Sequence, residues 1–247
     1  MRTEEFITLL SKSAQGEDGY NKLRNGLPLG LDAAGEIVCS QTRERPFVRH
    51  TCVTGVKRTA FIKRFIVALS CLYEKDEANF LVLSPRSEYG ELLRLKSLDI
   101  TVPYVREKAD LESAKACVLE LLHMHTTGKG YPRLFLVLDG LEELDGCNQN
   151  SDLEEYRAFF DVLARRENVD VITGAELMKS IFSGYPGAFV GVGNCLVTTR
   201  EEGKADVTYV GDDSSLSQPT AVRVPDSPSV METVIFLNAL STENNAV

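Results

Sequence analysis

The sequence of 247 residues lacks several features that would assign it directly to a functional class. No apolar run is long enough to cross a lipid bilayer, and the start MRTEEFITLL has acidic residues where a secretory signal needs positive charge. We therefore expect a cytoplasmic protein. The chain also lacks a basic excess, since its formal net charge is −9. That balance argues against a free-standing nucleic-acid binder, although it leaves room for a local basic patch.

Cysteine and histidine motifs are missing as well. The six cysteines contain no C-x-x-C pair, and we expect reduced, buried thiols at Cys39, Cys52, Cys71, Cys117, Cys147 and Cys195. His123 and His125 are two residues apart on an expected helix, so they point to different sides and do not suit a metal pair. With His50 as the one other histidine, residue order gives no support for a Ser-His-Asp or Cys-His site. No metal site is predicted.

What the chain does contain is an alternation of apolar strands and amphipathic helices. The segment 27–41 suits a hairpin with its turn near Ala34 and Gly35. Further strands are expected to end at Gly55 and to cover 80–85, 101–105, 134–140, 169–175, 195–199, 206–211 and 220–225. Helices are expected over 56–75, 87–97, 110–125, 151–167 and 228–240. No internal repeat is present.

This order of elements predicts an α/β fold. Strands separated by helices form βαβ units and hence a mostly parallel central sheet flanked by helices. The strand-rich C-terminal part predicts an antiparallel extension. We expect an N-terminal helical extension over 1–26 and a single α/β domain over 27–247.

Ligands of parallel sheets bind at the carboxyl ends of strands, and one expected strand ends at Gly55. There a strand runs through a glycine directly into a helix, which is the setting of the phosphate-binding loop G-x-x-x-x-G-K-[ST]. When the motif is counted without gaps from Gly55, Ala60 stands at the position of its second glycine. Phe61 then stands at the position of the lysine and Ile62 at that of the Ser or Thr. Apolar side chains cannot balance phosphate charge, so the motif fails.

A second strand end is LFLVLDG at 134–140. Motor ATPases place Asp-Glu there, the Asp for the metal ion and the Glu for the attacking water. This chain keeps Asp139 but has Gly140 next, and Glu142 and Glu143 follow where they point elsewhere.

Taken together, these segments resemble the FtsK/SpoIIIE motor domain, a RecA-like P-loop fold. PLGLDAAGEIVCSQTRERPFVRHTCVTG is similar to the entry into its phosphate loop, and FLVLSPRSEYGELL to its strand ending in Asp-Pro-Lys, with Ser84 and Arg86 in place of Asp and Lys. LFLVLDGLEEL is similar to its metal-site strand. LARRENVDVITGAELM is similar to its Ala-Thr-Gln-Arg-Pro strand, with Glu176 and Leu177 in place of the sensing Gln and Arg. The resemblance covers about residues 27–200 in order.

The departures imply a motor-like domain that does not hydrolyse ATP, because charge stabilisation supplies nearly all the rate in phosphoryl transfer. We expect no cofactor, and whether nucleotide is bound without cleavage stays open. Gly55, Lys57, Arg58 and Asp139 are the predicted remnant of the nucleotide pocket. The resemblance implies a structural or regulatory subunit or adaptor. It would contact other FtsK-like ATPase subunits, a type VII secretion complex or a conjugative DNA-transfer complex, and it could form a homo-oligomer.

Two other functions remain open from the residues. One is a weak ATPase in which Lys57, Lys63 or a residue of a partner replaces the missing lysine. The other is a nucleic-acid-binding module that uses the basic stretch 43–64 (Arg43, Arg45, Arg49, Lys57, Arg58, Lys63 and Arg64), for which a solvated basic face is the plainer interpretation. Residues 139–155 hold seven acidic residues and no basic one. They are read as a solvated acidic surface or a docking face, and the glycines of GAFVGVGN as a turn.

Overall fold

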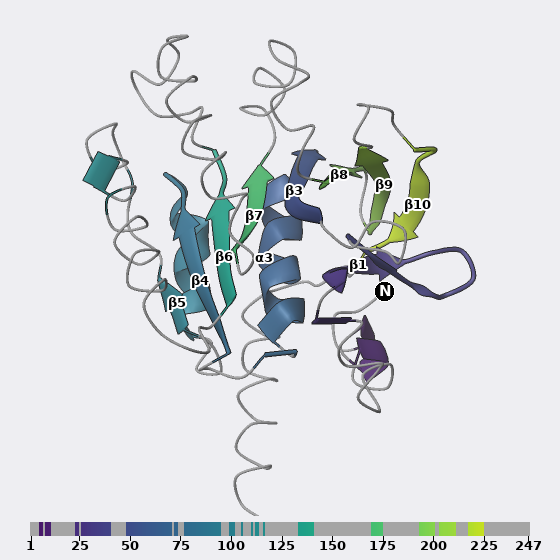
Figure 1. Ribbon diagram of the computed structural model, residues 1–247, viewed down its shortest axis with the longest axis horizontal. Helices are drawn as coiled ribbons and strands as arrows, with labels where there is room; N and C mark the ends of the chain where they lie inside the picture. The colour runs from purple at the N-terminus through teal and green to yellow at the C-terminus, as the bar shows by residue number, and fades with distance from the viewer. Residues whose placement is uncertain are drawn as a thin grey trace, which may run out of the picture.

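A computed structural model gives the arrangement of the chain (Figure 1). It describes residues 5–6, 8–10, 23–24, 26–40, 48–70, 72–73, 77–94, 99–101, 105, 110, 112–113, 116, 133–140, 169–174, 193–200, 203–210 and 217–224. Within these residues, ten strands form one sheet in the order β2-β1-β10-β9-β8-β3-β7-β6-β4-β5. No helix of the described part has both the length and the hydropathy that crossing a bilayer requires.

One half of the sheet is parallel. It consists of β3 (Val48–Gly55), β4 (Ala78–Leu83), β5 (Asp99–Thr101), β6 (Arg133–Leu138), β7 (Val169–Gly174) and β8 (Gly193–Thr199). The pairs β3–β7, β3–β8, β4–β5, β4–β6 and β6–β7 all run parallel. β6 and β7 are apolar and buried along nearly their whole length, as strands covered on both faces are. The parallel strand pairing predicted from the sequence is thus present in this half.

The other half is antiparallel and brings strands from the N-terminal and C-terminal parts of the described chain together. β9 (Lys204–Val210) and β10 (Thr220–Arg223) follow β8, and β10 pairs with β1 (Pro28–Leu31). β1 and β2 (Ile37–Cys39) form the expected hairpin, closed by Gly35 at φ 86° and by the Asp32 carboxylate. With four antiparallel and five parallel pairs, the described sheet is mixed rather than mostly parallel.

The helix α3 (Arg58–Ser70) packs on the sheet and fills the core on that side (Figure 1). It has contacts with β1, β3 and β7. Phe61, Phe65 and Leu69 are spaced one turn apart and are all buried, which confirms the predicted apolar face. Phe6 and Leu10 of the N-terminal segment are buried in the same cluster, so part of the predicted extension contributes to the core.

The segment after β4 differs from the expectation. The predicted helix over 87–97 is a 3₁₀ helix, η1 (Ser87–Arg94), which buries Tyr89 and Leu92 and leaves Leu93 exposed. Of the predicted helix over 110–125, the structure describes residues 110, 112, 113 and 116, all of them helical. The helices expected over 151–167 and 228–240 lie outside the described residues, as do Glu142, Glu143, Glu176 and Leu177. Most of the expected turn GAFVGVGN also lies outside them, and its last two residues, Gly193 and Asn194, begin β8.

A buried ion pair ties the amino ends of β6 and β7 together. The Arg133 guanidinium donates to both oxygens of Asp170, with Nη2 at 2.9 Å from Oδ1, and their side chains are 13% and 1% exposed. Arg133 also donates to the Tyr73 hydroxyl at 2.9 Å and to the Arg24 carbonyl at 2.8 Å. Asp170 lies on the amino-terminal side of the sheet, opposite the edge where a ligand site is expected.

Candidate functional site

The carboxyl ends of the parallel strands bring several polar residues to one edge of the sheet. β3 ends at Gly55, β4 leads into Ser84, β6 leads into Asp139, and β8 ends at Thr199. Because these strands run parallel, their ends share an edge, and α3 begins at the same edge directly after β3. This is the edge at which the sequence predicts a remnant nucleotide pocket.

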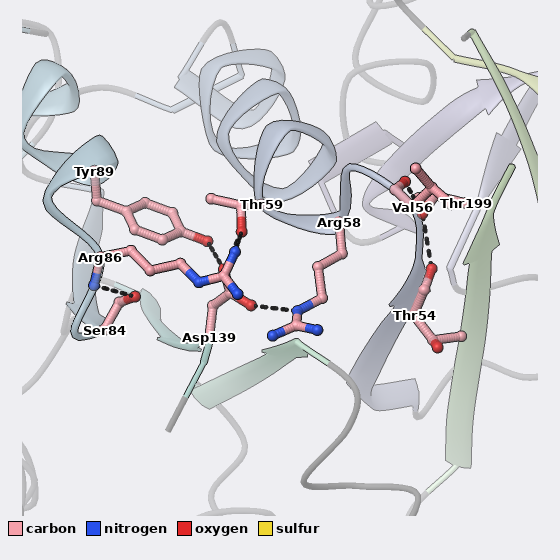
Figure 2. Close-up of polar contacts among 9 residues, drawn as sticks. All are labelled: Thr54, Val56, Arg58, Thr59, Ser84, Arg86, Tyr89, Asp139 and Thr199. Carbon is pink, nitrogen blue, oxygen red and sulfur yellow. Dashed lines mark hydrogen bonds and ion pairs between the residues drawn. The ribbon is translucent and has the colours of Figure 1, made fainter. Parts of the chain in front are cut away.

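Asp139 is at the centre of this edge and is fully buried (Figure 2). Its Oδ1 accepts a hydrogen bond from Arg58 Nε at 2.9 Å. Its Oδ2 accepts one from Thr59 Oγ1 at 2.6 Å and one from the Tyr89 hydroxyl at 2.9 Å. Both carboxylate oxygens therefore have donors from the same chain, one of them a positive charge.

A second arginine, Arg86, contacts one of the donors to Asp139. Arg86 Nη1 donates to Thr59 Oγ1 at 2.8 Å, and the Arg86 backbone N–H donates to Ser84 Oγ at 3.2 Å (Figure 2). We refer to Arg58, Thr59, Arg86, Tyr89 and Asp139 as the Asp139 cluster. Burial raises the pKa of Tyr89 well above its ordinary value, and the neighbouring Asp139 carboxylate raises it further. Tyr89 is therefore a neutral donor to Asp139.

Two glycines make room for this carboxylate. A side chain at Gly174 would place its Cβ 1.9 Å from Asp139 Oδ1, so the end of β7 must be glycine for the carboxylate to lie there. Gly140 has φ 75°, a left-handed conformation that strains other residues. A glutamate in that position, as motor ATPases have, would be strained in this backbone.

The connection between β3 and α3 is short and held by β8. It consists of two residues, Val56 and Lys57, and Gly55 has φ 97° and Lys57 φ 61°. Thr199 Oγ1 lies 2.8 Å from the Thr54 carbonyl oxygen and 2.6 Å from that of Val56 (Figure 2). A Cβ on Gly55 would lie 2.2 Å from the Thr199 carbonyl oxygen. The connection is thus fixed in one conformation against the end of β8.

The structure brings two of the four predicted site residues into contact. Arg58 and Asp139 form an ion pair, whereas Gly55 ends β3 and lies against Thr199 of β8. Lys57 is exposed at the tip of that connection, and the described contacts do not place it on Asp139.

Phe61 and Ile62 do not lie at the phosphate-binding positions that the sequence predicts for them. An ungapped count puts them at the phosphate-binding positions, but α3 begins at Arg58, so they lie one turn further along the helix. They are 4% and 0% exposed and belong to the hydrophobic core. The count fails because it assumes four residues between the glycines of the loop, whereas two residues join β3 to α3. The first turn of the helix instead presents Arg58 and Thr59.

Sequence reasoning missed Thr59, Tyr89, Gly174 and Thr199. A count that allowed a shorter loop would have found Thr59, because Arg58-Thr59 then takes the position of the Lys-[ST] pair. Nothing in the sequence signals that Tyr89 reaches Asp139, since the two are 50 residues apart. Ser84 and Arg86, noted as departures from the family pattern, do lie at the site.

The basic stretch is partly neutralised within the chain. Arg58 is paired with Asp139, and Lys63 is paired with Glu91 of η1. Arg43 and Arg45 lie outside the described residues. Of the five basic residues of this stretch that the structure describes, two are therefore paired with carboxylates of the same chain.

The described cysteines confirm the prediction of reduced, buried thiols. Cys39, Cys52 and Cys195 are free and buried, and burial raises the pKa of Cys52 to about 12. His50 is buried and lies 2.9 Å from Thr173 Oγ1, within the sheet. Among the residues with a described position, no group of three or more His, Cys, Asp or Glu could hold a metal ion.

Comparison with known proteins identifies the class of fold. No protein-family model matches the sequence, and no curated protein matches it in sequence either. Solved structures do match: the mixed sheet, with α3 at the end of β3, is that of RecA-like ATPase domains.

The matching structures are FtsK/SpoIIIE-like domains of type VII secretion ATPases. The cytoplasmic domain of EccC from Thermomonospora curvata aligns with a TM-score of 0.63 and 14% identity, over 87% of this chain and 31% of that one. EssC (ATPases 2 and 3) from Geobacillus thermodenitrificans aligns with a TM-score of 0.53 and 17% identity, over 82% and 41%. Thermomonospora curvata EccC (ATPases 2 and 3), solved with a signal sequence peptide, aligns with a TM-score of 0.52 and 12% identity, over 83% and 41%.

This likeness is one of fold. The chain spans between 31% and 41% of the length of these solved chains, which is a fraction of each ATPase. The resemblance predicted from the sequence is thus confirmed in the architecture, at identities that leave the chemistry to be argued from the residues themselves.

Proposed function

We propose that this chain is a non-hydrolysing FtsK/SpoIIIE-like domain that serves as a structural or regulatory subunit of a secretion or DNA-translocation ATPase assembly. One observation carries the proposal. Asp139, which would hold the catalytic metal ion in a motor ATPase, is fully buried and bound by Arg58, Thr59 and Tyr89 of its own chain.

The residues present do not fit a magnesium ion. Mg²⁺ is bound through one or two carboxylates together with phosphate oxygens and water, in near-ideal octahedral geometry. The Asp139 carboxylate already accepts three hydrogen bonds, and one donor is a guanidinium, which repels a cation. Binding a metal ion there would require Arg58 to leave a buried partner, which is costly.

The connection between β3 and α3 does not fit a triphosphate either. A phosphate-binding loop wraps the phosphates with the backbone N–H groups of four residues between its two glycines. Here the connection has two residues, and Thr199 holds it against β8. We therefore derive no hydrolytic step for this domain.

The fold supports a place beside active ATPases. EccC and EssC carry several ATPase domains in one chain, as the names of their solved fragments state (ATPases 2 and 3), and this chain matches a part of such chains. A domain with the same architecture can occupy the position of a motor domain without taking part in turnover. The partner we propose is an FtsK-type ATPase subunit.

Steady-state ATP hydrolysis tests the first half of the proposal. Purified protein is expected to turn over Mg-ATP at the background rate, and the variant Asp139→Ala is expected to show the same rate. Turnover above background that disappears in Asp139→Ala would overturn the proposal and favour the weak ATPase.

Complex formation tests the second half. The purified chain is titrated against the FtsK-type and type VII ATPases encoded in the same genome, and their association is measured by analytical ultracentrifugation. A saturable complex with one of them is expected. Failure to bind any of them would contradict a role in their assembly.

A further inference from the structure

The Asp139 cluster has more positive than negative groups. Arg58 and Arg86 each bring a guanidinium to it, whereas Asp139 is its one carboxylate. Arg58 Nε lies 2.9 Å from Asp139 Oδ1. Arg86 Nη1 lies 2.8 Å from Thr59 Oγ1, and that hydroxyl oxygen lies 2.6 Å from Asp139 Oδ2. Both guanidinium groups therefore attract a negative charge at the position of this carboxylate, one directly and one across a hydroxyl.

The uncharged members of the cluster donate hydrogen bonds to the same position. The hydroxyl groups of Thr59 and Tyr89 both donate to Asp139 Oδ2, at 2.6 Å and 2.9 Å. Figure 2 shows these side chains and that of Arg58 converging on the carboxylate from the start of α3 and from η1. Each of these three partners is a donor, and a lining of donors suits an anion rather than a cation.

The carboxylate fills the space between these donors. The Asp139 side chain is 0% exposed, and the neighbouring Gly174 adds no side chain that could take its place. A shorter residue at position 139 would leave a hole of carboxylate size beside two guanidinium groups. Buried positive charge without a counter-charge is costly, so such a hole favours the entry of an anion.

We infer that Arg58, Thr59, Arg86 and Tyr89 form an anion site that the Asp139 carboxylate occupies and closes, and that a small carboxylate ion enters this site when the Asp139 carboxylate is removed. The inference deepens the proposed function and rests on it in one respect, the absence of a metal ion and a nucleotide at Asp139. An internal ligand of this kind keeps external anions out of the wild-type protein and holds α3 and η1 against the end of β6.

The test compares the wild-type protein with Asp139→Ala, using sodium formate as the probe and sodium chloride of equal ionic strength as the reference, at neutral pH. The midpoint of thermal unfolding of the wild type is expected to be the same in both salts. Asp139→Ala is expected to unfold at a lower temperature in chloride. It is expected to gain about 3–6 °C when formate is at about ten times its dissociation constant.

Further variants separate this site from a general effect of formate. Asp139→Asn keeps the size of the side chain and leaves no hole, so no response to formate is expected. In the Asp139→Ala background, Arg58→Ala removes the direct charged donor and is expected to raise the dissociation constant of formate about tenfold or more. Arg86→Ala is expected to raise it by a smaller factor, because its charge lies one hydroxyl away. An equal response to formate in Asp139→Asn, or one that Arg58→Ala leaves unchanged, overturns the inference.

The remaining outcomes also decide the question. An Asp139→Ala variant that folds but ignores formate overturns the inference, and so does a wild type that formate stabilises as strongly. Should Asp139→Ala be unfolded in chloride, folding on addition of formate supports the inference. Absence of folding in both Asp139→Ala and Asp139→Gly, with or without formate, overturns it. ATP binding by the wild type would instead defeat the proposed function, so the two failures are distinguishable.

Discussion

Single residues decide how the buried carboxylate of Asp139 is kept stable. Arg58 supplies the counter-charge, and Thr59 and Tyr89 supply neutral hydrogen bonds, so that both oxygens are satisfied. Hydrogen bonds to a charged acceptor are worth more than those to a neutral one, and loss of a buried partner costs the most. The contribution of each residue can therefore be separated by removing single groups.

Tyr89→Phe removes one donor to the carboxylate and leaves the ring in place. We expect the free energy of unfolding to fall by about 1.5–3 kcal/mol, measured by urea denaturation. Tyr209→Phe is the matched control, because its hydroxyl donates to the neutral carbonyl of Cys39 at 2.6 Å. Its cost is expected to be smaller, about 0.5–1.5 kcal/mol. Equal costs in the two variants would contradict the charged acceptor at Asp139.

Arg58→Ala removes the one guanidinium that donates directly to the Asp139 carboxylate, which has no exposure. In the absence of divalent metal we expect the free energy of unfolding to fall by about 3–5 kcal/mol. The measurement is urea denaturation at neutral pH in EDTA. A loss of less than about 1 kcal/mol, typical of surface ion pairs, would contradict the buried pair.

Cys52 gives the stability a dependence on alkaline pH. Burial raises its pKa from 9.0 to about 12, so the folded chain keeps a proton that the unfolded chain releases. The unfolded state then binds fewer protons above pH 9, and the contribution of Cys52 to stability is full below pH 9 and declines as the pH rises toward 12. We expect Cys52→Ala to reduce this decline. The free energy of unfolding of both proteins is measured by urea denaturation between pH 8 and 11. An equal decline with pH in the wild type and Cys52→Ala would contradict the prediction.

At the level of elements, the connection between β3 and α3 determines what the site can bind. Its conformation depends on Gly55 at φ 97° and on the contacts of Thr199. Gly55→Ala would force a Cβ to 2.2 Å from the Thr199 carbonyl oxygen. We expect a loss of more than about 2 kcal/mol in unfolding free energy.

Gly90→Ala is the control for this glycine, because a Cβ there would meet nothing within 4 Å. We expect a change within about ±0.5 kcal/mol. If both alanine variants have the same stability, the connection is not held in the way described.

The sequence predicts most of the described elements and few of the contacts between them. β1–β2, β3, α3 and β6 were placed because their periodicity and their Gly and Asp signals are local. The 3₁₀ form of η1 was missed, since its apolar spacing also suits an α-helix. The partners of Asp139 could not be predicted, because Tyr89 and Arg58 are brought to it by the order of the strands and not by any spacing along the chain.

For the whole molecule, the likeness to EccC and EssC in fold and the residues present at the site are two separate observations. Strand order and the position of α3 follow from burying apolar strands and helices, which many sequences achieve, and the likeness to EccC and EssC lies at this level. The ungapped count assigned the phosphate-binding positions to Phe61 and Ile62, which are core residues, because the length of the loop cannot be read from the sequence. The proposal that this domain does not hydrolyse ATP rests on Arg58 and on the short connection between β3 and α3.

The proposed function requires that Arg58 of this chain supplies to Asp139 the positive charge that Mg²⁺ supplies in a motor ATPase. Isothermal titration of the purified wild-type protein with Mg-ATP, at millimolar nucleotide and low ionic strength, tests it most directly. We predict no saturable heat, and the same trace for the wild type and Asp139→Asn. Saturable binding of one Mg-ATP per chain that Asp139→Asn abolishes would contradict the account.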